Sequence, residues 1–390
     1  MKIGLIGLNQ TGKTTLFELL SGRSGGGGSG GGGSGGGVSS GSSGSRGSSG
    51  GSGGTGIGGG DRKSASIGMG QVPDERVDIL SAMYRPKKTT YAKIEFTDVA
   101  GFTASGDGGN AGAARFLNDV RPCDALIHVL RAFDSETVAH DLGDVDPARD
   151  LEAVEMEMLF ADMEMIERRI GRLKAGKKIS KDQTAEIGLL ERCYAQLENG
   201  GAMSDMDMTE EELAVMQGYA FLTEKPRLAV VNLDERQWKA GDYHHRDELL
   251  ALCAKLNMPL ILLCVEMELE ISRLADDDKK LFMDDLGIAQ PGIAVLASAM
   301  YGLLGQISFF TVGEDEVRAW TIDKGSSARI SAGKIHSDIE RGFIRAEVVK
   351  YENLVELGSM AKVKEQGLFR LEGKEYIVAD GDIISFRFNV

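Results

Sequence analysis

The sequence predicts an α/β fold, in which a doubly wound parallel sheet is interrupted by a helical hairpin and followed by a smaller α+β domain. The first observation is a series of short, nearly continuous apolar runs separated by helical patterns, which is typical of strands buried on both faces. The second is a change, from about residue 307, to short alternating strands such as "EVRAWTI" and "DIISFRF". The apolar runs lie at 2–7, 93–101, 124–133, 226–235 and 258–266.

Two insertions separate these runs. Residues 24–60 are almost entirely Gly and Ser, so we expect this tract to be disordered, whether it is a natural low-complexity insertion or an engineered linker. Residues 148–205 show helical periodicity around a basic turn and predict a hairpin whose methionines pack one helix on the other. The expected division is a main α/β domain from 1–147 and 206–305, the hairpin from 148–205 and a C-terminal domain from 306–390.

Composition limits the possible partners. The 390-residue chain has 59 Asp and Glu against 44 Lys and Arg, a net charge of −15 that opposes general adhesion to DNA, RNA or an anionic membrane. Any RNA contact must therefore be local. The four cysteines form no CxxC pair, as in reduced cytoplasmic proteins. No apolar run approaches the ~20 residues that span a bilayer, so we expect a cytoplasmic protein without a membrane partner.

The first apolar run leads into a phosphate-binding loop. Gly7 to Thr14, "GLNQTGKT", satisfies GxxxxGK[ST] between a predicted strand and a predicted helix, which is the context that this motif requires. Backbone N–H groups would surround the phosphates, Lys13 would add a cation at the β- and γ-phosphates, and the Thr14 hydroxyl would bind Mg²⁺. The expected nucleotide contacts of the loop are Asn9, Gln10, Thr11, Gly12, Lys13, Thr14 and Thr15.

The next apolar run supplies the partner of this loop. In "FTDVAGF", Asp98 is placed where a P-loop NTPase has a carboxylate near Mg²⁺, and the N–H of Gly101 can meet the γ-phosphate. A bare DxxG pattern is common in sequences, but one strand after a phosphate loop it is specific. Thr14 and Asp98 are therefore the predicted metal ligands.

Base recognition is expected after the strand at 226–231. GTPases read guanine with Asn-Lys-x-Asp, whereas this chain has Asn232, Leu233, Asp234 and Glu235. Leu233 replaces the Lys that stacks on the base, and Glu235 replaces the guanine-reading Asp with a longer side chain. We expect Asn232, Leu233 and Glu235 to line a base site without guanine preference; a polar loop without a base contact is the alternative.

These motifs, with "DALIHVLRAF", "VDPARDLEAVEMEMLFADMEMIERRI" and the C-terminal "GKIHSDIERGFIRAEVVKYENL" and "RLEGKEYIVADGDIISFRFNV", resemble the YchF-type Obg-like ATPases. The similarity covers the chain apart from the Gly/Ser tract, and the C-terminal segment resembles that family's TGS domain, a ubiquitin-like fold. The resemblance implies ATP as substrate in preference to GTP, Mg²⁺ as cofactor and slow hydrolysis. It also implies association with the ribosome, through its large subunit or as a whole, with rRNA contacts from the hairpin and the TGS domain.

The resemblance also implies which residue orients the attacking water. The family carries an apolar residue, here Phe102, where Ras-like enzymes have a Gln, and a His after the strand "DALIHVLRAF" takes over that role. It maps onto His140, so the expected catalytic residues are His140 and Lys13. The alternative for His140 is an exposed loop residue.

Departures from the family pattern keep other functions open. The phosphate loop has Asn9, Gln10 and Thr11 where the family usually has Pro-Asn-Val, and the switch I region falls in or beside the Gly/Ser tract. A nucleotide-binding interaction module with negligible hydrolysis is one alternative, and a guanine-specific translational GTPase, disfavoured by Leu233 and Glu235, is the other. The basic runs at 85–88 and 174–181 are the candidate rRNA contacts, or else solvated turns.

Overall fold

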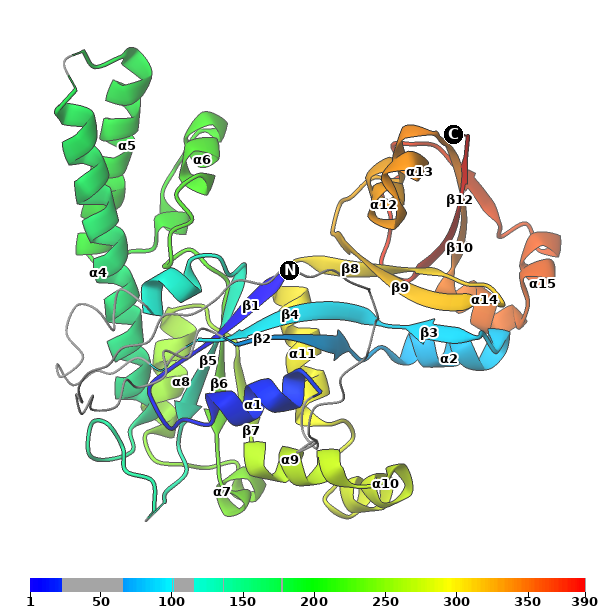
Figure 1. Ribbon diagram of the computed structural model, residues 1–390, viewed down its shortest axis with the longest axis horizontal. Helices are drawn as coiled ribbons and strands as arrows, with labels where there is room; N and C mark the ends of the chain where they lie inside the picture. Colours follow the sequence, from blue (N-terminus) through cyan, green and yellow to red (C-terminus); the bar gives the residue numbers. More distant parts are fainter. Residues whose placement is uncertain (23–65, 100, 102–115, 136, 177, 390) are drawn as a thin grey trace, which may run out of the picture.

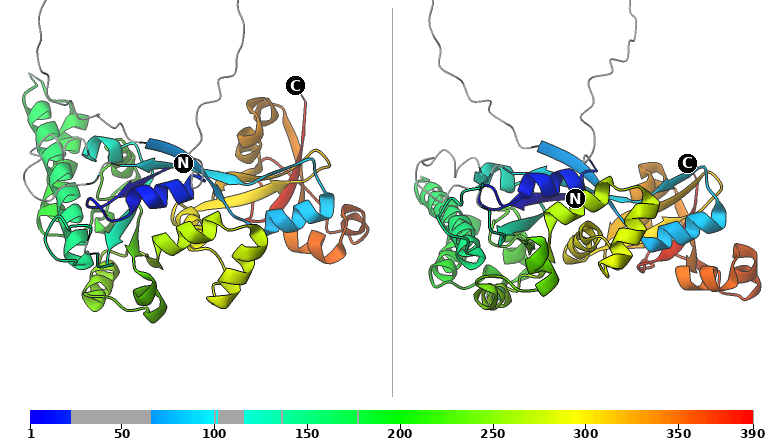
Figure 2. Two further views of the ribbon diagram at one scale, coloured as in Figure 1. Left: turned by 60° about the horizontal axis from the view of Figure 1, so that its bottom comes forward. Right: turned by 90° about the horizontal axis from the view of Figure 1, so that it is seen from below.

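The computed structural model describes residues 1–22, 66–99, 101, 116–135, 137–176 and 178–389 (Figure 1). The Gly/Ser tract, Phe102 and Lys177 lie outside the described residues. Within the described parts of the chain, every helix is too short or too polar to cross a bilayer. The hairpin and the C-terminal sheet lie at opposite ends of the molecule in all views (Figures 1 and 2).

The first sheet has six strands in the order β2-β4-β1-β5-β6-β7. Strands β4, β1, β5, β6 and β7 are parallel, as the apolar runs predict, and the α/β fold class is confirmed. The edge strand β2 runs antiparallel to β4, so the sheet is mixed. The sequence analysis did not identify β2, because its burial alternates and gives no continuous apolar run. The bounds are β1 Lys2–Ile6, β2 Ser66–Val72, β4 Ala92–Asp98, β5 Ala125–Arg131, β6 Arg227–Asn232 and β7 Leu260–Leu263.

Helices cover both faces of this sheet. The helices α1 (Lys13–Leu20), α9 (Val265–Arg273) and α11 (Gly292–Leu303) pack with the side chains of Ile3, Leu5 and other residues of one face. On the opposite face lie α4 (Pro147–Lys174) and α8 (Arg246–Lys255) (Figure 1). This half also contains α6 Glu210–Gln217, α7 Glu235–Ala240 and α10 Asp276–Asp285, with a short 3₁₀ helix, η2, at Met203–Asp205.

The hairpin consists of α4 and α5 (Lys181–Glu198). Asp146 caps α4 through hydrogen bonds from two backbone N–H groups, and Pro147 follows at the first helical position. Val154 and Met158, in the first half of α4, are buried against the sheet. The second half leaves the sheet and packs on α5 through Ile166 and its neighbours. One helix therefore belongs both to the half of the molecule that contains the first sheet and to the projecting hairpin.

The second sheet has the order β11-β10-β12-β8-β9-β3. Its edge strand β3 comes from residues 88–90, a segment that the sequence analysis places in the main α/β domain, and it pairs in parallel with β9. The helical stretch at 328–341 is divided at His336, which caps the second piece. The bounds are β3 Lys88–Thr90, β8 Gln306–Thr311, β9 Glu316–Asp323, β10 Phe343–Lys350, β11 Arg370–Glu372, β12 Asp382–Phe388, α12 Ala328–Ile335, α13 Ser337–Arg341, α14 Tyr351–Leu357 and α15 Met360–Glu365.

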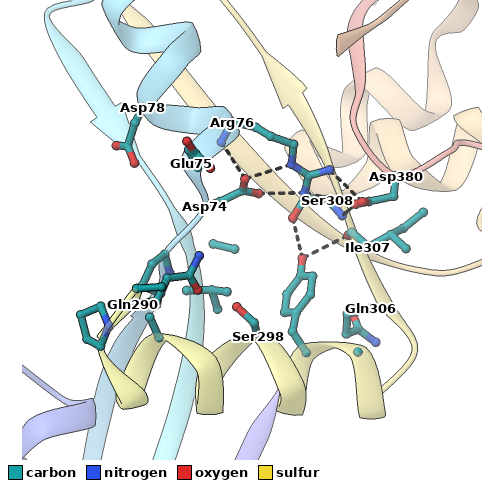
Figure 3. Close-up of a pocket in the computed structure, with 18 residues that line it drawn as sticks. Asp74, Glu75, Arg76, Asp78, Gln290, Ser298, Gln306, Ile307, Ser308 and Asp380 are labelled. Atoms are coloured by element: carbon teal, nitrogen blue, oxygen red, sulfur yellow. Dashed lines mark hydrogen bonds and ion pairs between the residues drawn. The ribbon is translucent and has the colours of Figure 1, made fainter. Parts of the chain in front are cut away.

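An ion-pair bridge joins the two halves beside a pocket of about 720 Å³ (Figure 3). Arg76, in the first turn of α2 (Glu75–Tyr84), donates to Asp74 at 2.9 Å and to Asp380 of the C-terminal half at 2.7 Å. Asp380 also accepts from the backbone N–H of Ser308 at 2.9 Å. The Arg76 guanidinium lies over the ring of Phe310, 5.0 Å from its centre. The bridge is thus anchored on both sides of the junction.

We predict that Arg76→Ala lowers the free energy of unfolding by about 1–3 kcal/mol, because it leaves two partly enclosed carboxylates without their shared donor. Chemical denaturation measures this change. The matched control is Lys87→Ala, since the Lys87–Asp315 pair also joins the two halves but is fully solvated, and its loss should cost at most about 0.5 kcal/mol. Equal effects of the two substitutions would show that the Arg76 bridge is not a stabilising contact.

Candidate nucleotide-binding site

The phosphate loop lies at the carboxyl end of β1, between the neighbouring strands β4 and β5. Two of its glycines are required both by a positive φ angle and by neighbouring atoms that leave no room for a Cβ. Gly7 has φ 138°, and a Cβ there would lie 2.4 Å from the carbonyl oxygen of Val129. Gly12 has φ 95°, and a Cβ there would lie 2.4 Å from the Asn232 amide nitrogen. The loop therefore closes tightly against β5 and the end of β6, with the N-terminus of α1 directly after it.

Lys13 is folded back onto the loop. Its ammonium group is buried and donates to the carbonyl oxygen of Leu8. Burial lowers the pKa of Lys13 to about 8, an effect that the nearby carboxylates of Asp98 and Asp141 oppose. A phosphate placed in the loop would give the buried ammonium an anionic oxygen in place of the neutral carbonyl of Leu8, so the geometry favours an anionic ligand here.

The two predicted metal ligands are brought together. Thr14 Oγ1 donates to Asp98 Oδ2 at 3.0 Å, although the two residues are 84 positions apart in the sequence. A hydroxyl and a carboxylate oxygen suit Mg²⁺, which usually takes few protein ligands and completes its shell with water and phosphate oxygens. Among the described residues, no group of three or more His, Cys, Asp or Glu side chains forms a separate metal site. The donor set therefore fits a metal held jointly with a nucleotide.

Other loop residues are fixed by contacts that the sequence analysis did not identify. Asn9 Nδ2 donates to Asp141 Oδ2 at 2.9 Å, which ties the loop to the segment after β5. A Cβ on Gly101 would lie 2.1 Å from Asn9 Oδ1, so Gly101 lies directly against the phosphate loop. Thr11 is buried and donates to the carbonyl oxygen of Leu8, whereas Gln10 is exposed with φ 58°. Thr15 is partly buried within α1.

Asn232 holds the phosphate loop in place. Its amide nitrogen donates to the carbonyl oxygen of Thr11 at 3.0 Å, and its amide oxygen accepts from the backbone N–H of Val265 at 3.1 Å. The side chain is 6% exposed, so these bonds are protected from water. Asn232 thereby connects the loop to the start of α9, at the place where a base would follow the phosphates.

The two other predicted base-site residues do not turn their side chains toward this region. Leu233 is 2% exposed and packs in the core with Leu130, so a contact from Leu233 to a base has to come from its backbone. Glu235 is exposed and pairs with Lys239 at 2.5 Å on the surface of α7. Between them, Asp234 caps α7 in a reciprocal pair of hydrogen bonds with Gln237. The loop thus has a clear structural role.

His140 lies in the segment after β5, with both ring nitrogens engaged. Its Nε2 lies 2.8 Å from Asp150 Oδ2, and its Nδ1 accepts from the backbone N–H of Leu142 at 3.2 Å. Nε2 therefore carries the proton and donates to the carboxylate. The side chain is only 3% exposed, so His140 is not the exposed loop residue of the alternative interpretation. Burial raises the pKa of Asp150, and its contacts with His140 and Arg149 oppose this.

Arg131 holds the segment that carries His140. This arginine ends β5, is 2% exposed and donates to the carbonyl oxygens of Phe133, Val138 and Ala139. In the sheet it pairs with Asn232, so the two organising side chains start from neighbouring strand ends. A charged residue at the end of an otherwise apolar strand was a signal available in the sequence, but its partners were not.

Comparisons with known proteins agree with this geometry. The profile of the YchF-GTPase_C family, described as "Protein of unknown function (DUF933)", matches residues 306–389. The chain is 41% identical to the ribosome-binding ATPase YchF of Bacillus subtilis (strain 168), over 83% of this chain and 89% of that protein. It is 33% identical to the same-named protein of Buchnera aphidicola subsp. Acyrthosiphon pisum (strain APS), over 100% and 99%. The structure of the Schizosaccharomyces pombe YchF GTPase matches with a TM-score of 0.80 at 26% identity, over 99% of this chain and 97% of that one.

We predict that Asn232→Ala weakens the binding of ATP and GTP analogues alike by about tenfold or more, because the loss of two buried hydrogen bonds, ~1–3 kcal/mol, releases the phosphate loop. Calorimetric titration measures both affinities. Lys239→Ala serves as the control, since it removes only an exposed ion pair one helix away. Unchanged affinities in Asn232→Ala would contradict the proposed support of the loop.

Proposed function

The chain belongs to the YchF family of P-loop NTPases, and on this premise we propose that it is a Mg²⁺-dependent ATPase that hydrolyses ATP slowly and acts on the ribosome in the cytoplasm. The observation that carries the proposal is the phosphate loop with Lys13 buried beside the Thr14–Asp98 pair. Curated relatives named ribosome-binding ATPases support the choice of nucleotide and partner. We assign residues 1–147 and 206–305 to the nucleotide-binding domain, 148–205 to the hairpin and 306–390 to the TGS domain.

The roles of the site residues follow from their positions. Backbone N–H groups of the phosphate loop and the start of α1 would bind the phosphates, and Lys13 would exchange its bond to Leu8 for a phosphate oxygen. Thr14 and Asp98 would hold Mg²⁺, which supplies charge neutralisation at the phosphates. Gly101 would offer its N–H near the γ-phosphate. These contacts position the nucleotide and do not depend on the base.

The proposed preference for ATP rests on two side chains that make no guanine-specific contact. A guanine-reading carboxylate must accept two hydrogen bonds from the base, but Glu235 points to the surface and pairs with Lys239. Leu233 is enclosed in the core and cannot stack on a base as a Lys would. Guanine therefore gains no specific contact from these two side chains, and an adenine loses none. A guanine-specific GTPase is correspondingly disfavoured.

His140 requires a rearrangement to act on water. With Nε2–H directed at Asp150 and Nδ1 occupied by Leu142, neither nitrogen can accept a proton in the observed conformation. We propose that hydrolysis takes place when the segment after β5 shifts and frees one nitrogen, while Asp150 retains the ring. The same locked arrangement favours, as the second candidate function, a nucleotide-binding interaction module with negligible hydrolysis.

Basic side chains of the hairpin are suited to rRNA phosphates. Among the described turn lysines, Lys174 is paired with Glu191 at 2.7 Å, so it is less available to rRNA phosphates. A hollow of about 320 Å³, which we call the arginine hollow, lies beside the second half of α4. Within the described residues Arg168 pairs with Glu164 and Arg169 pairs with Glu186. Among the same residues Arg172 forms no ion pair, and the side chain of Arg121 donates only to the sulfur of Met165. The hollow is lined by Arg121, Met165, Arg168, Arg169, Arg172 and Tyr219.

The proposed activity predicts a contrast between two variants in a multiple-turnover phosphate-release assay with ATP and GTP, with and without ribosomes. Lys13→Ala should abolish tight nucleotide binding, because Lys13 meets phosphate in the ground state. His140→Ala should leave binding nearly intact and lower hydrolysis by roughly 10²-fold, as for the loss of a general base. Equal hydrolysis by wild type and His140→Ala would refute the catalytic assignment of His140, and negligible hydrolysis by both would favour the interaction module. A GTP affinity tenfold above that for ATP would remove the ATPase assignment.

For the ribosome, we predict that the double substitution Arg121→Gln and Arg172→Gln weakens co-sedimentation and reduces its salt dependence, since each lost phosphate contact lowers the slope by about one. The double substitution Lys279→Gln and Lys280→Gln, on α10 at a distance from the hairpin, is the charge-matched control. Replacing Lys174, Lys178 and Lys181 instead tests the basic turn. A salt slope that does not change in the arginine variant would exclude the arginine hollow from the interface.

A further inference from the structure

Strand β2 forms a free edge of the first sheet (Figure 1). Among the described residues it pairs only with β4, so one side of its backbone has no strand beside it. It has seven residues, all of which pair with β4 in one continuous register without a bulge. The other edge strands of the described sheets, β3, β7 and β11, have only three, four and three residues. β2 is therefore the longest open edge in the described part of the chain.

This edge lacks the features that prevent a strand from pairing further. Natural edge strands are protected by charged side chains, proline or bulges, because their unpaired backbone N–H and C=O groups can bind another strand. The sequence of β2 is SIGMGQV, which contains neither a charged residue nor a proline. Ile67 and Met69 are each 52% exposed. An unprotected edge with exposed apolar side chains is typical of a surface that receives an added strand.

A hollow of about 390 Å³, which we call the edge hollow, runs along the free side of β2. The strand contributes Met69, Gly70 and Gln71, which are consecutive in the chain. Successive residues of a strand point to opposite faces, so three in a row share one hollow only at the edge of the strand. Among the described residues none of β4 lines the hollow, which agrees with this position. The other walls are Leu19, Leu20, Ser21, Gly22, Pro73 and Ile293.

The walls of the edge hollow indicate which side chains it can receive. Its described walls contain no charged side chain, in a chain with a net charge of −15. Leu19 and Leu20 are buried residues at the end of α1, and Ile293 lies at the start of α11. A strand placed beside β2 would direct every second side chain toward the face that α1 covers. The hollow therefore suits large uncharged side chains at alternate positions, because a charge enclosed there would have no partner.

A second copy of this chain does not supply such side chains. When two β2 strands pair in antiparallel fashion about a two-fold axis, residues of the same face meet. The face toward α1 carries Gly68, Gly70 and Val72, since a Cβ on either glycine would collide with the end of that helix. The glycines offer no side chain, and Val72 is 6% exposed within its own core. Two copies paired in this way would leave both hollows unfilled.

We propose that the free edge of β2 binds an extended, uncharged segment of another protein that has large apolar side chains at every second position. The backbone of this segment pairs with β2, and its apolar side chains fill the edge hollow. On the opposite face the segment lies beside Ile67 and Met69. Backbone hydrogen bonds supply affinity in such an added strand, and the hollow supplies specificity. This binding is separate from the proposed nucleotide and ribosome functions and does not depend on them.

The test uses the full chain without nucleotide and, as probe, the end-capped peptide Lys-Thr-Leu-Thr-Val-Thr-Leu-Thr-Glu, which has no net charge. The matched control peptide has the same side chains but N-methyl groups on its central backbone amides, so it cannot donate to β2. NMR of methyl-labelled protein follows both titrations. We expect the probe to bind at least tenfold more tightly than the control and to shift the methyl signal of Met69. Equal affinities, no binding of either peptide, or an unshifted Met69 signal would overturn the proposal.

Two double variants locate the site by calorimetry. Ile67→Lys with Met69→Lys gives β2 the charges that protect other edge strands, at side chains that are half exposed and so tolerate the change. It should weaken the probe at least tenfold. The control, Ile344→Lys with Ile377→Lys, adds the same charges at exposed apolar positions of the C-terminal half and should leave binding unchanged. Equal affinities of the two variants for the probe would place it away from β2 and contradict the proposal.

Two measurements on the free chain test other occupants of the edge. Within Ser66–Val72, the amide hydrogens that do not bond to β4 should exchange rapidly, and the probe should slow them. Protection of all these amides in the free chain would mean that the edge is already covered, which would overturn the proposal. Sedimentation velocity should find a monomer. A dimer that the Ile67→Lys and Met69→Lys variant abolishes would assign the edge to a second copy and remove the proposed partner.

Discussion

The side-chain amide of Asn232 is the contact on which the geometry of the nucleotide site depends. The phosphate loop is a tight curve of backbone that has to present its N–H groups inward, and such a curve needs external support for its remaining polar groups. Asn232 gives that support from the end of a buried strand, with one bond to Thr11 and one to Val265. Gly12 is constrained in turn, because any side chain there would collide with the amide.

One segment of the chain contributes strands to both sheets and so connects the two halves of the molecule. Residues 66–98 leave the first sheet after β2, form α2 and β3 against the C-terminal half, and return as β4, whose last residue is Asp98. One hydrophobic core includes Ile3 and Leu16 of the nucleotide-binding half together with Phe310 and Val317 of the C-terminal half. Asp98, the proposed metal ligand, therefore ends the segment that also makes contacts with the C-terminal sheet.

Local patterns in the sequence predicted the parts of the site that are local. The phosphate loop, its flanking strand and helix, and the strand that ends in Asp98 are each encoded within about ten residues, and their spacing predicts that Thr14 and Asp98 meet. What could not be predicted depends on partners distant in the sequence. The pairing of residues 88–90 with β9, the enclosure of Leu233 beside Leu130, and the bond between Asn9 and Asp141 follow from tertiary packing that no single segment encodes.

The conformation of His140 is the clearest example of such a tertiary effect. It separates two properties that a sequence motif treats as one, namely the position of the imidazole and the availability of its nitrogens to bind water. The sequence places an imidazole after β5, where it can approach the phosphates; the structure adds Asp150, which fixes the proton on Nε2, and Arg131, which holds the carbonyl groups of the segment before it. A ring positioned in this way is stable but has no free lone pair for water. Nδ1 is freed only when the Leu142 contact breaks, and the neighbouring Asp141 ties the same segment to the phosphate loop through Asn9. The segment that holds the histidine is therefore also in contact with the loop that would receive the phosphates, so under the proposed mechanism nucleotide binding and the state of the histidine depend on the same contacts.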